Sequence, residues 1–207
     1  MSERLRVGGI VLCGGQSRRM GRSKAWLPFG NEIMLPRVVR LLAEAVEPVV
    51  VVAAPDQDVP PLPPEIPIVR DAQPKRGPLQ GLSAGLSGLQ AKTDAFYLSS
   101  CDVPFLNPHF ALRLVELLED DHICVPKVGG HHHPLAAVYR TSVKAPVERL
   151  LAEDRLRPFF LFQEVPTRVV EAQELADVDP NFETLRNLNT PEEYKAALED
   201  FQTRSEI

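Results

Sequence analysis

Short apolar segments without polar alternation recur along the chain and are separated by segments with helical spacing. "VGGIVL" (7–12), "PVVVVAA" (48–54) and "AFYLSSCD" (95–102) are of the first kind, and each predicts a strand buried on both faces. Such strands belong to parallel sheets covered by helices. The pattern therefore predicts an α/β fold with a doubly wound, mostly parallel sheet. Further strands are predicted at 66–71, 123–128, 134–140 and 167–172, the second and third flanking a turn at "GGHHH".

Apolar residues spaced by three and four predict the helices between these strands. Leu79, Leu82, Leu86 and Leu89 mark one face of such a helix. Thr190 and Glu193 form a capping box around Pro191, which predicts a last helix running to about Phe201, with 202–207 frayed. Other helices are predicted at 31–46, 108–120 and 141–154, whereas the residues just after 158 show no clear pattern.

Composition limits the class of protein and its partners. The 207 residues show no break in composition, which predicts one domain over 1–207. The net charge is −5 and no apolar run approaches 18 residues, so neither nucleic acid nor a membrane is an expected partner. Three widely spaced cysteines fit neither a disulfide framework nor a zinc site and favour a reducing cytoplasm.

The predicted sheet directs attention to the ends of its strands. In doubly wound sheets, ligands bind outside the carboxyl ends of the strands, near the point where the strand order reverses. This rule selects the chain after Leu12, after Asp71 and around Asp102.

The loop after the first strand, "LCGGQSRRMGRSK" (12–24), combines glycines with positive charge on an acidic protein. It matches neither the P-loop pattern nor the dinucleotide fingerprint. Gly14 and Gly15 have no Cβ, so main-chain N–H groups there can approach an anion or a base edge. Arginine and lysine side chains can surround a triphosphate, although a solvated basic turn is the alternative. The charged residues of this loop are Arg18, Arg19, Arg22 and Lys24.

The same loop resembles the L-[AC]-G-G-x-S-x-R-M-G-x-x-K signature of nucleotidyltransferases with a Rossmann-like fold. Within that group the chain most resembles the molybdenum-cofactor guanylyltransferases of the MobA type. Four further segments agree in order, and the resemblance spans residues 7 to 195. These segments are "RDAQPKRGPLQGL" (70–82), "SSCDVPF" (99–105), "HHPLAAVYR" (132–140) and "NLNTPEE" (187–193).

The resemblance implies a role for individual residues. Arg19 and Lys24 would neutralise the phosphates and the leaving pyrophosphate, and Asp102 would be the catalytic Mg²⁺ ligand. Asp71 would bind either guanine or ribose. Asn187 and Asn189 would lie on the acceptor side, with turn and cap formation as the competing explanation. The residues implied in GTP binding are Leu12, Cys13, Gly14, Gly15, Lys24, Asp71 and Gly77.

The implied reaction transfers GMP from GTP to the terminal phosphate of molybdopterin, or of its molybdenum-loaded form, and releases pyrophosphate. The acceptor phosphate is largely ionised at pH 7, because its second pKa is about 6, so no protein nucleophile is needed. The resemblance also implies other proteins of the molybdenum-cofactor pathway as partners.

Three alternatives remain open at this point. The chain could be a cytidylyltransferase acting on the same pterin, or a nucleotidyltransferase for another phosphorylated acceptor such as a sugar phosphate or a deazaflavin precursor. It could also be a non-catalytic nucleotide sensor, although a sensor needs neither Lys24 nor Asp102. A metal cluster at His131, His132 and His133 is not expected, because consecutive residues of a strand point to opposite faces.

Overall fold

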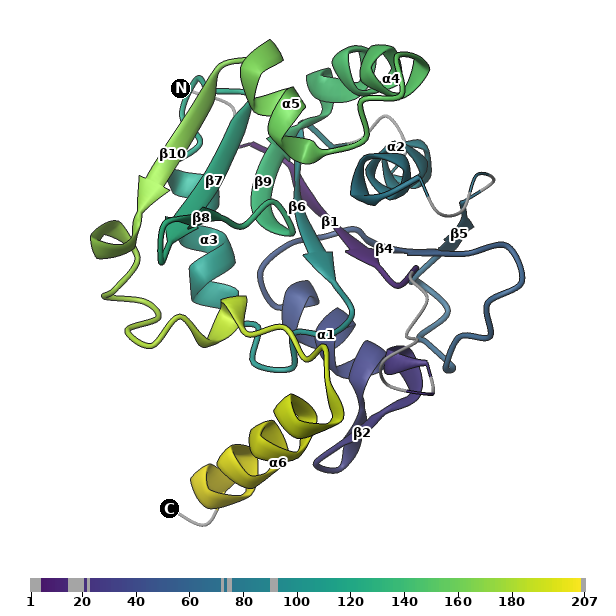
Figure 1. The fold of residues 1–207 in the computed structure, drawn as a ribbon, viewed down its shortest axis with the longest axis vertical. Helices are drawn as coiled ribbons and strands as arrows, with labels where there is room; N and C mark the ends of the chain where they lie inside the picture. The colour runs from purple at the N-terminus through teal and green to yellow at the C-terminus, as the bar shows by residue number, and fades with distance from the viewer. Residues whose placement is uncertain are drawn as a thin grey trace.

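A computed structural model describes residues 5–14, 21, 23–71, 73, 76–89 and 93–205 of the chain. Its central sheet has the strand order β10-β7-β9-β6-β1-β4-β5, with β8 paired to β7 (Figure 1). The strands of this sheet are β1 (Val7–Leu12), β4 (Val49–Ala53), β5 (Ile68–Arg70), β6 (Ala95–Ser100), β7 (Ile123–Val128), β8 (His131–His132), β9 (Ala136–Arg140) and β10 (Thr167–Glu171).

The sheet is mostly parallel, which confirms the predicted fold class. β1 runs parallel to both β4 and β6, β4 to β5, and β7 to β10. β9 lies antiparallel between β6 and β7, and the short β8 is antiparallel to β7. Each predicted strand is present, and the two-residue strand β8 forms where only a turn was predicted.

Helices cover both faces of the sheet, and each face has its own apolar core. α2, α4 and α5 lie on one face, and α1 and α3 on the other (Figure 1). The α-helices are α1 (Met34–Ala43), α2 (Pro78–Gly88), α3 (Pro108–Glu116), α4 (Lys144–Ala152), α5 (Pro158–Glu164) and α6 (Pro191–Ser205), and short 3₁₀ helices lie at η1 (Lys24–Trp26), η3 (Thr141–Val143), η4 (Ala172–Glu174) and η5 (Glu183–Leu185).

The first helix begins later than predicted. Residues 31–33 belong to a small hairpin of β2 (Pro28–Phe29) and β3 (Glu32–Ile33), and α1 starts at Met34. The hairpin turns at Gly30, whose φ of +60° suits glycine and is incompatible with a right-handed helix at this residue. The prediction of a helix from residue 31 was therefore wrong by three residues.

Helix α2 lies unusually close to β1. A Cβ added at Gly81 would be 3.0 Å from Leu12 Cδ2, so only glycine allows this approach without displacement. Leu79 and Leu82 are buried beneath the helix, as the leucine spacing predicted. The close packing places the first turn of α2, which begins at Pro78, beside the carboxyl end of β1.

Helix α5 was not predicted from the sequence. Its segment "PFFLFQE" has apolar residues on several sides, so it lacks a clear period. Leu161 is fully buried against the core shared with α2 and α4, while Phe159 is exposed. Tertiary packing, rather than an amphipathic pattern, stabilises this short helix.

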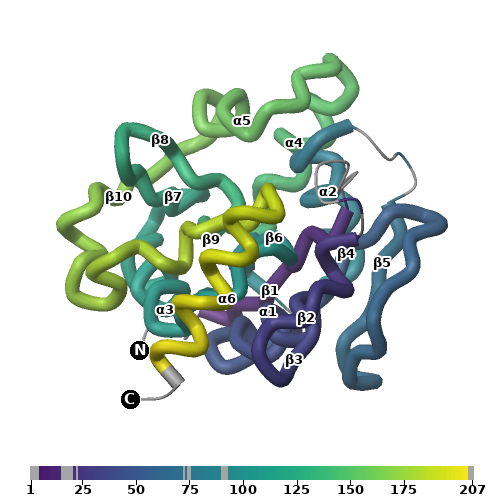
Figure 2. Tube along the Cα trace, turned by 60° about the horizontal axis from the view of Figure 1, so that its bottom comes forward, coloured from purple at the N-terminus to yellow at the C-terminus, as the bar shows by residue number. Residues whose placement is uncertain are grey.

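Helix α6 lies outside the sheet, beside the β2–β3 hairpin (Figures 1 and 2). The predicted capping box is present, because Glu193 N donates to Thr190 Oγ1 at 3.2 Å and Thr190 N donates to Glu193 Oε2 at 3.0 Å. Ala197 packs with Phe29 and Met34 in a small third core. The helix continues to Ser205, so residues 202–205 are helical rather than frayed as predicted, and 206–207 lie outside the described residues.

No helix in these described ranges has the length and apolar character that crossing a membrane would need.

Candidate active site

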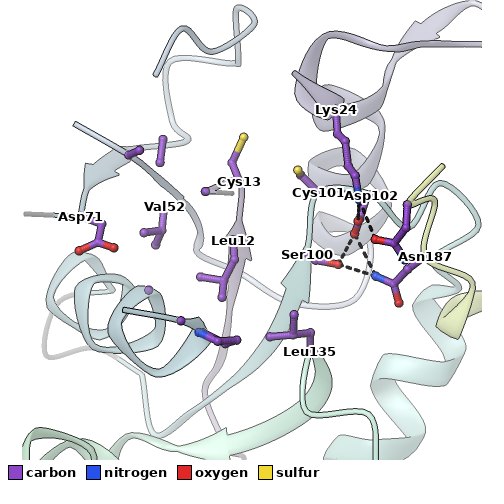
Figure 3. A pocket seen from close by; sticks show the side chains of 17 residues that line it. Leu12, Cys13, Lys24, Val52, Asp71, Ser100, Cys101, Asp102, Leu135 and Asn187 are labelled. Atoms are coloured by element: carbon purple, nitrogen blue, oxygen red, sulfur yellow. Dashed lines mark hydrogen bonds and ion pairs between the residues drawn. The ribbon is translucent and has the colours of Figure 1, made fainter. Parts of the chain in front are cut away.

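The strand order reverses at β1, and a cavity of about 530 Å³ lies there at the carboxyl ends of the strands (Figure 3). β1 has β4 on one side and β6 on the other, and α1 and α2 cross on opposite faces. A doubly wound sheet leaves its ligand crevice at this point. The cavity is lined by Leu12, Cys13, Gly14, Lys24, Val52, Ala53, Ala54, Asp71, Gly77, Pro78, Gly81, Ser100, Cys101, Asp102, Leu135, Asn187 and Asn189.

The Asp102 carboxylate at the end of β6 is held by hydrogen bonds to both of its oxygens. Oδ1 accepts from Ser100 Oγ at 2.6 Å and from Asn187 Nδ2 at 2.9 Å. Oδ2 accepts from Lys24 Nζ at 2.6 Å. Asp102 is only 8% exposed, so these bonds lie in a region of reduced dielectric, where charge-assisted bonds are strong. The carboxylate therefore has one fixed orientation.

Lys24, at the start of η1, extends this network to the last part of the chain. Its ammonium lies 2.8 Å from Asn189 Oδ1 as well as beside Asp102 (Figure 3). Residues 24, 102 and 189 are far apart in sequence, so the network ties three separate segments together.

Asn187 and Asn189 lie in the irregular segment between η5 and α6, and both line the cavity. Leu188 is fully buried in the small core with Phe29, and its N–H donates to Asp102 O at 3.0 Å. Asn189 N also donates to Glu193 Oε2 at 2.6 Å, so capping and cavity contacts coexist in this segment.

The opposite end of the cavity is mainly apolar and contains Asp71, which Figure 3 shows on the far side of Leu12 from Asp102. Asp71 N donates to Ala53 O at 2.9 Å, and the carboxylate accepts from Gln73 N at 2.9 Å. These bonds hold Asp71 just beyond the edge strand β5.

Gly14 borders open space at the end of β1. A Cβ added there would have Ala54 N, at 4.0 Å, as its nearest described neighbour. Internal packing therefore does not require glycine at this position. The missing side chain leaves room for a bound molecule to approach the main chain.

Two thiols lie next to each other in the cavity wall, at the ends of β1 and β6. A hydrogen bond from Cys101 lowers the pKa of Cys13. Gln57 Nε2 lies 3.2 Å from Cys13 Sγ and also lowers this pKa, whereas burial raises it. The same bond between the thiols, together with burial, raises the pKa of Cys101 well above its ordinary value. Cys13 is therefore the more acidic thiol of the pair.

The structure brings together every predicted site residue that it describes. These residues are Leu12, Cys13, Gly14, Lys24, Asp71, Gly77, Asp102, Asn187 and Asn189. Gly15 and Arg19, together with Arg18 and Arg22, lie outside the described residues.

Sequence reasoning missed Ser100. A signal was available, because Ser100 lies two residues before Asp102, and alternate residues of the predicted strand at 95–102 share one face. Of the segment around the histidines, Leu135 reaches the cavity, whereas the His133 ring lies 3.4 Å from Val128 O. Burial lowers the pKa of His133.

The donor set at Asp102 fits one kind of metal site. Among the described ranges, no group of three histidine, cysteine or acidic side chains could enclose a metal ion. Mg²⁺ commonly uses one or two carboxylates and completes its coordination with substrate phosphates and water. Asp102 fits a site of that kind.

A doubly wound sheet with a lysine–carboxylate pair in a cavity at its switch point suits the binding of a nucleotide's phosphates, and the family match makes the chain a nucleotidyltransferase. Residues 9–167 match the family model described as "MobA-like NTP transferase domain", and the chain belongs to this family.

Individual relatives agree with this family. A Mycobacterium tuberculosis protein named "Probable molybdenum cofactor guanylyltransferase" is 38% identical over 156 residues, which cover 70% of this chain and 73% of that protein. The crystal structure of molybdopterin-guanine dinucleotide biosynthesis protein A from Archaeoglobus fulgidus has a TM-score of 0.76 at 19% identity and covers 95% of this chain and 99% of its own. Another M. tuberculosis protein of this fold, solved in complex with manganese, has a TM-score of 0.65 at 14% identity, covering 94% and 98% of the two chains.

Proposed function

We propose that the protein is a molybdenum cofactor guanylyltransferase, which transfers GMP from GTP to the terminal phosphate of molybdopterin or its molybdenum-loaded form. Pyrophosphate is the other product. The observation that carries the proposal is the cavity, which has a lysine–carboxylate network at one end and an apolar wall with an aspartate at the other. Such a cavity suits a nucleotide with its triphosphate at Lys24 and its base towards Asp71.

The apolar end supplies the features that a purine nucleotide needs. Leu12, Val52 and Gly81 offer flat apolar surface, and the open space at Gly14 lets the nucleotide approach the main chain. The Asp71 carboxylate can accept hydrogen bonds from guanine N1–H and N2–H₂, or from ribose hydroxyls. Gly77 and the start of α2 add backbone N–H groups at a helix N-terminus, which favours phosphate or ribose oxygens.

Lys24 performs the main electrostatic task. Its ammonium neutralises the negative charge that develops on the leaving pyrophosphate. We propose the same task for Arg19, which lies five residues earlier in the sequence. Asp102 would hold Mg²⁺, which when bound supplies charge screening at the phosphates.

The acceptor phosphate can attack without a protein base. It is largely ionised at pH 7, since its second pKa is about 6. Asn187 and Asn189 lie at the edge of the cavity beside Asp102, where their amides can position the acceptor. The protein's task is then to align the acceptor with the α-phosphorus and to exclude water.

Pyrophosphate release tests this proposal. The purified protein is incubated with Mg²⁺ and GTP, CTP, ATP or UTP in turn, with and without molybdopterin. We expect release from GTP alone and only with the pterin. Release from CTP instead would make the protein a cytidylyltransferase. No release from any nucleotide would contradict the proposal and favour another acceptor or a sensor.

The cellular setting follows from the same proposal. The three cysteines are free thiols, as expected in a reducing cytoplasm, where we place the protein. Molybdopterin would reach the site from other proteins of the cofactor pathway.

A further inference from the structure

The hydrogen bonds of Asp102 leave one oxygen for a metal ion. A carboxylate oxygen offers two lone-pair directions. On Oδ1 both are used, by the Ser100 hydroxyl at 2.6 Å and the Asn187 amide at 2.9 Å. Oδ2 is therefore the oxygen that can ligate a metal.

This remaining oxygen is already bound to a cation. Lys24 Nζ lies 2.6 Å from Oδ2, and the two side chains are only 16% and 11% exposed. A Mg²⁺ ion would bind Oδ2 at about 2.0–2.1 Å. The ammonium and the metal would then be two positive charges a few ångströms apart with little solvent between them, which is strongly unfavourable.

We propose that Lys24 competes with the metal for Asp102 in the ligand-free protein, so that the metal binds well only together with the nucleotide. The proposal rests on the proposed function, because the nucleotide's phosphates are what draw the ammonium away from Oδ2. In the empty site the lysine balances the carboxylate. In the loaded site the metal does so, and the lysine balances the phosphates.

The surroundings of Lys24 suit such a movement. Among the described residues, Lys24 Nζ also contacts Asn189 Oδ1 at 2.8 Å, and this contact can remain while the ammonium turns from Asp102 to a phosphate. The flexible four-carbon stem of lysine permits this displacement, whereas Ser100 and Asn187 keep Asp102 in place. The lysine therefore moves and the carboxylate stays.

Binding of Mn²⁺ without any nucleotide tests the competition directly. The probe is Mn²⁺ alone, followed by electron paramagnetic resonance of the free ion. Lys24→Met removes the charge and keeps an unbranched side chain, and we expect it to bind Mn²⁺ at least about tenfold more tightly than the unaltered protein. Lys24→Arg keeps the charge and should bind like the unaltered protein.

Two controls locate the effect. Lys144→Met removes an exposed charge on α4 and should leave Mn²⁺ affinity unchanged. Adding Asp102→Asn to Lys24→Met should abolish the gain, because it removes the proposed ligand. Circular dichroism of each variant establishes that the fold is retained.

The outcomes separate this proposal from the proposed function. Equal Mn²⁺ affinity in the unaltered protein and Lys24→Met overturns the competition, and so does a gain that survives Asp102→Asn. Absence of Mn²⁺ binding in both proteins overturns the metal assignment on which the competition rests. Since no nucleotide is present, failure of GTP turnover leaves these results intact and contradicts only the proposed function.

Discussion

The two ends of the cavity are built in different ways. Around Asp102, side chains from separate segments form a continuous network that is complete before any ligand arrives. Around Asp71, the wall is made of apolar side chains and main chain, and the carboxylate is held by a neighbouring backbone N–H. The network is suited to charge that develops during a reaction, whereas the apolar end is suited to a flat ring. Changes at the first end should therefore lower turnover, and changes at the second should lower affinity.

The largest effect is expected for Asp102→Ala. This change removes the proposed metal ligand, and kcat should fall by about a thousandfold. Pyrophosphate release at saturating GTP measures the loss, and circular dichroism checks the fold. Activity close to normal would show that Asp102 is not the metal ligand. It would also contradict the assignment of the chemical step to this end of the cavity.

A smaller effect on the same end is expected for Ser100→Ala. The hydroxyl positions Asp102 Oδ1 without ligating the metal, and loss of such a supporting bond typically costs roughly ten- to a hundredfold in metal affinity or activity. The dependence of turnover on Mg²⁺ concentration should shift to higher concentration. Ser99→Ala is the matched control, because Ser99 is buried on the same strand and is not part of the cavity wall. Equal behaviour of the two variants would argue against a positioning role.

The other end should respond in affinity. Asp71→Asn keeps the size of the side chain but removes its charge and one acceptor, and KM for the nucleotide should rise about tenfold with little change in kcat. Steady-state kinetics separate the two parameters. Asp56→Asn, at an exposed aspartate on the turn after β4, provides the control. If kcat fell instead, both ends of the cavity would take part in the chemical step. The separation into one end for turnover and one for affinity would then be wrong.

The last prediction concerns a labelling rate rather than turnover, that of a thiol in the wall between the two ends. The pKa of Cys13 is lowered by its bond from Cys101, whereas burial raises the pKa of Cys124 to about 12. Because the thiolate reacts, iodoacetamide at pH 8 should alkylate Cys13 more than about tenfold faster than Cys124. Peptide mass spectrometry measures both rates, and bound GTP should protect Cys13. Lack of protection would mean that the nucleotide does not pass this part of the wall.

Much of the fold follows from local sequence patterns. Non-alternating apolar segments predicted the strands, and leucine spacing predicted α2. The capping box at Thr190 predicted the start of α6. These signals depend on residues close together in the chain, so they can be recognised without knowing the tertiary structure.

The parts that could not be predicted depend on distant contacts. The sequence of α5 has no clear apolar period. What buries Leu161 is packing against other helices, which the local sequence does not indicate. β9 runs antiparallel to its neighbours because of the strands it pairs with, and no local sequence pattern indicates that pairing. At the site, the motif at 12–24 and the segment "SSCDVPF" (99–105) identified Lys24 and Asp102 separately, but their direct ion pair at 2.6 Å is a contact of the folded chain. The competition inferred for Lys24 rests on that contact.

Asn187 and Asn189 belong to the last part of the chain, so the cavity becomes complete only late in protein synthesis. Ribosomes release the sheet strands first, and β1 and β6 can pair while the segment leading into α6 is still inside the ribosome. Until that segment emerges, Lys24 and Asp102 lack their asparagine partners, and Leu27, Phe29 and Met34 lack their cover from Leu188 and Ala197. A nascent chain that has formed its sheet therefore still has an incomplete active site, and emergence of the segment through α6 from the ribosome is the step that completes it.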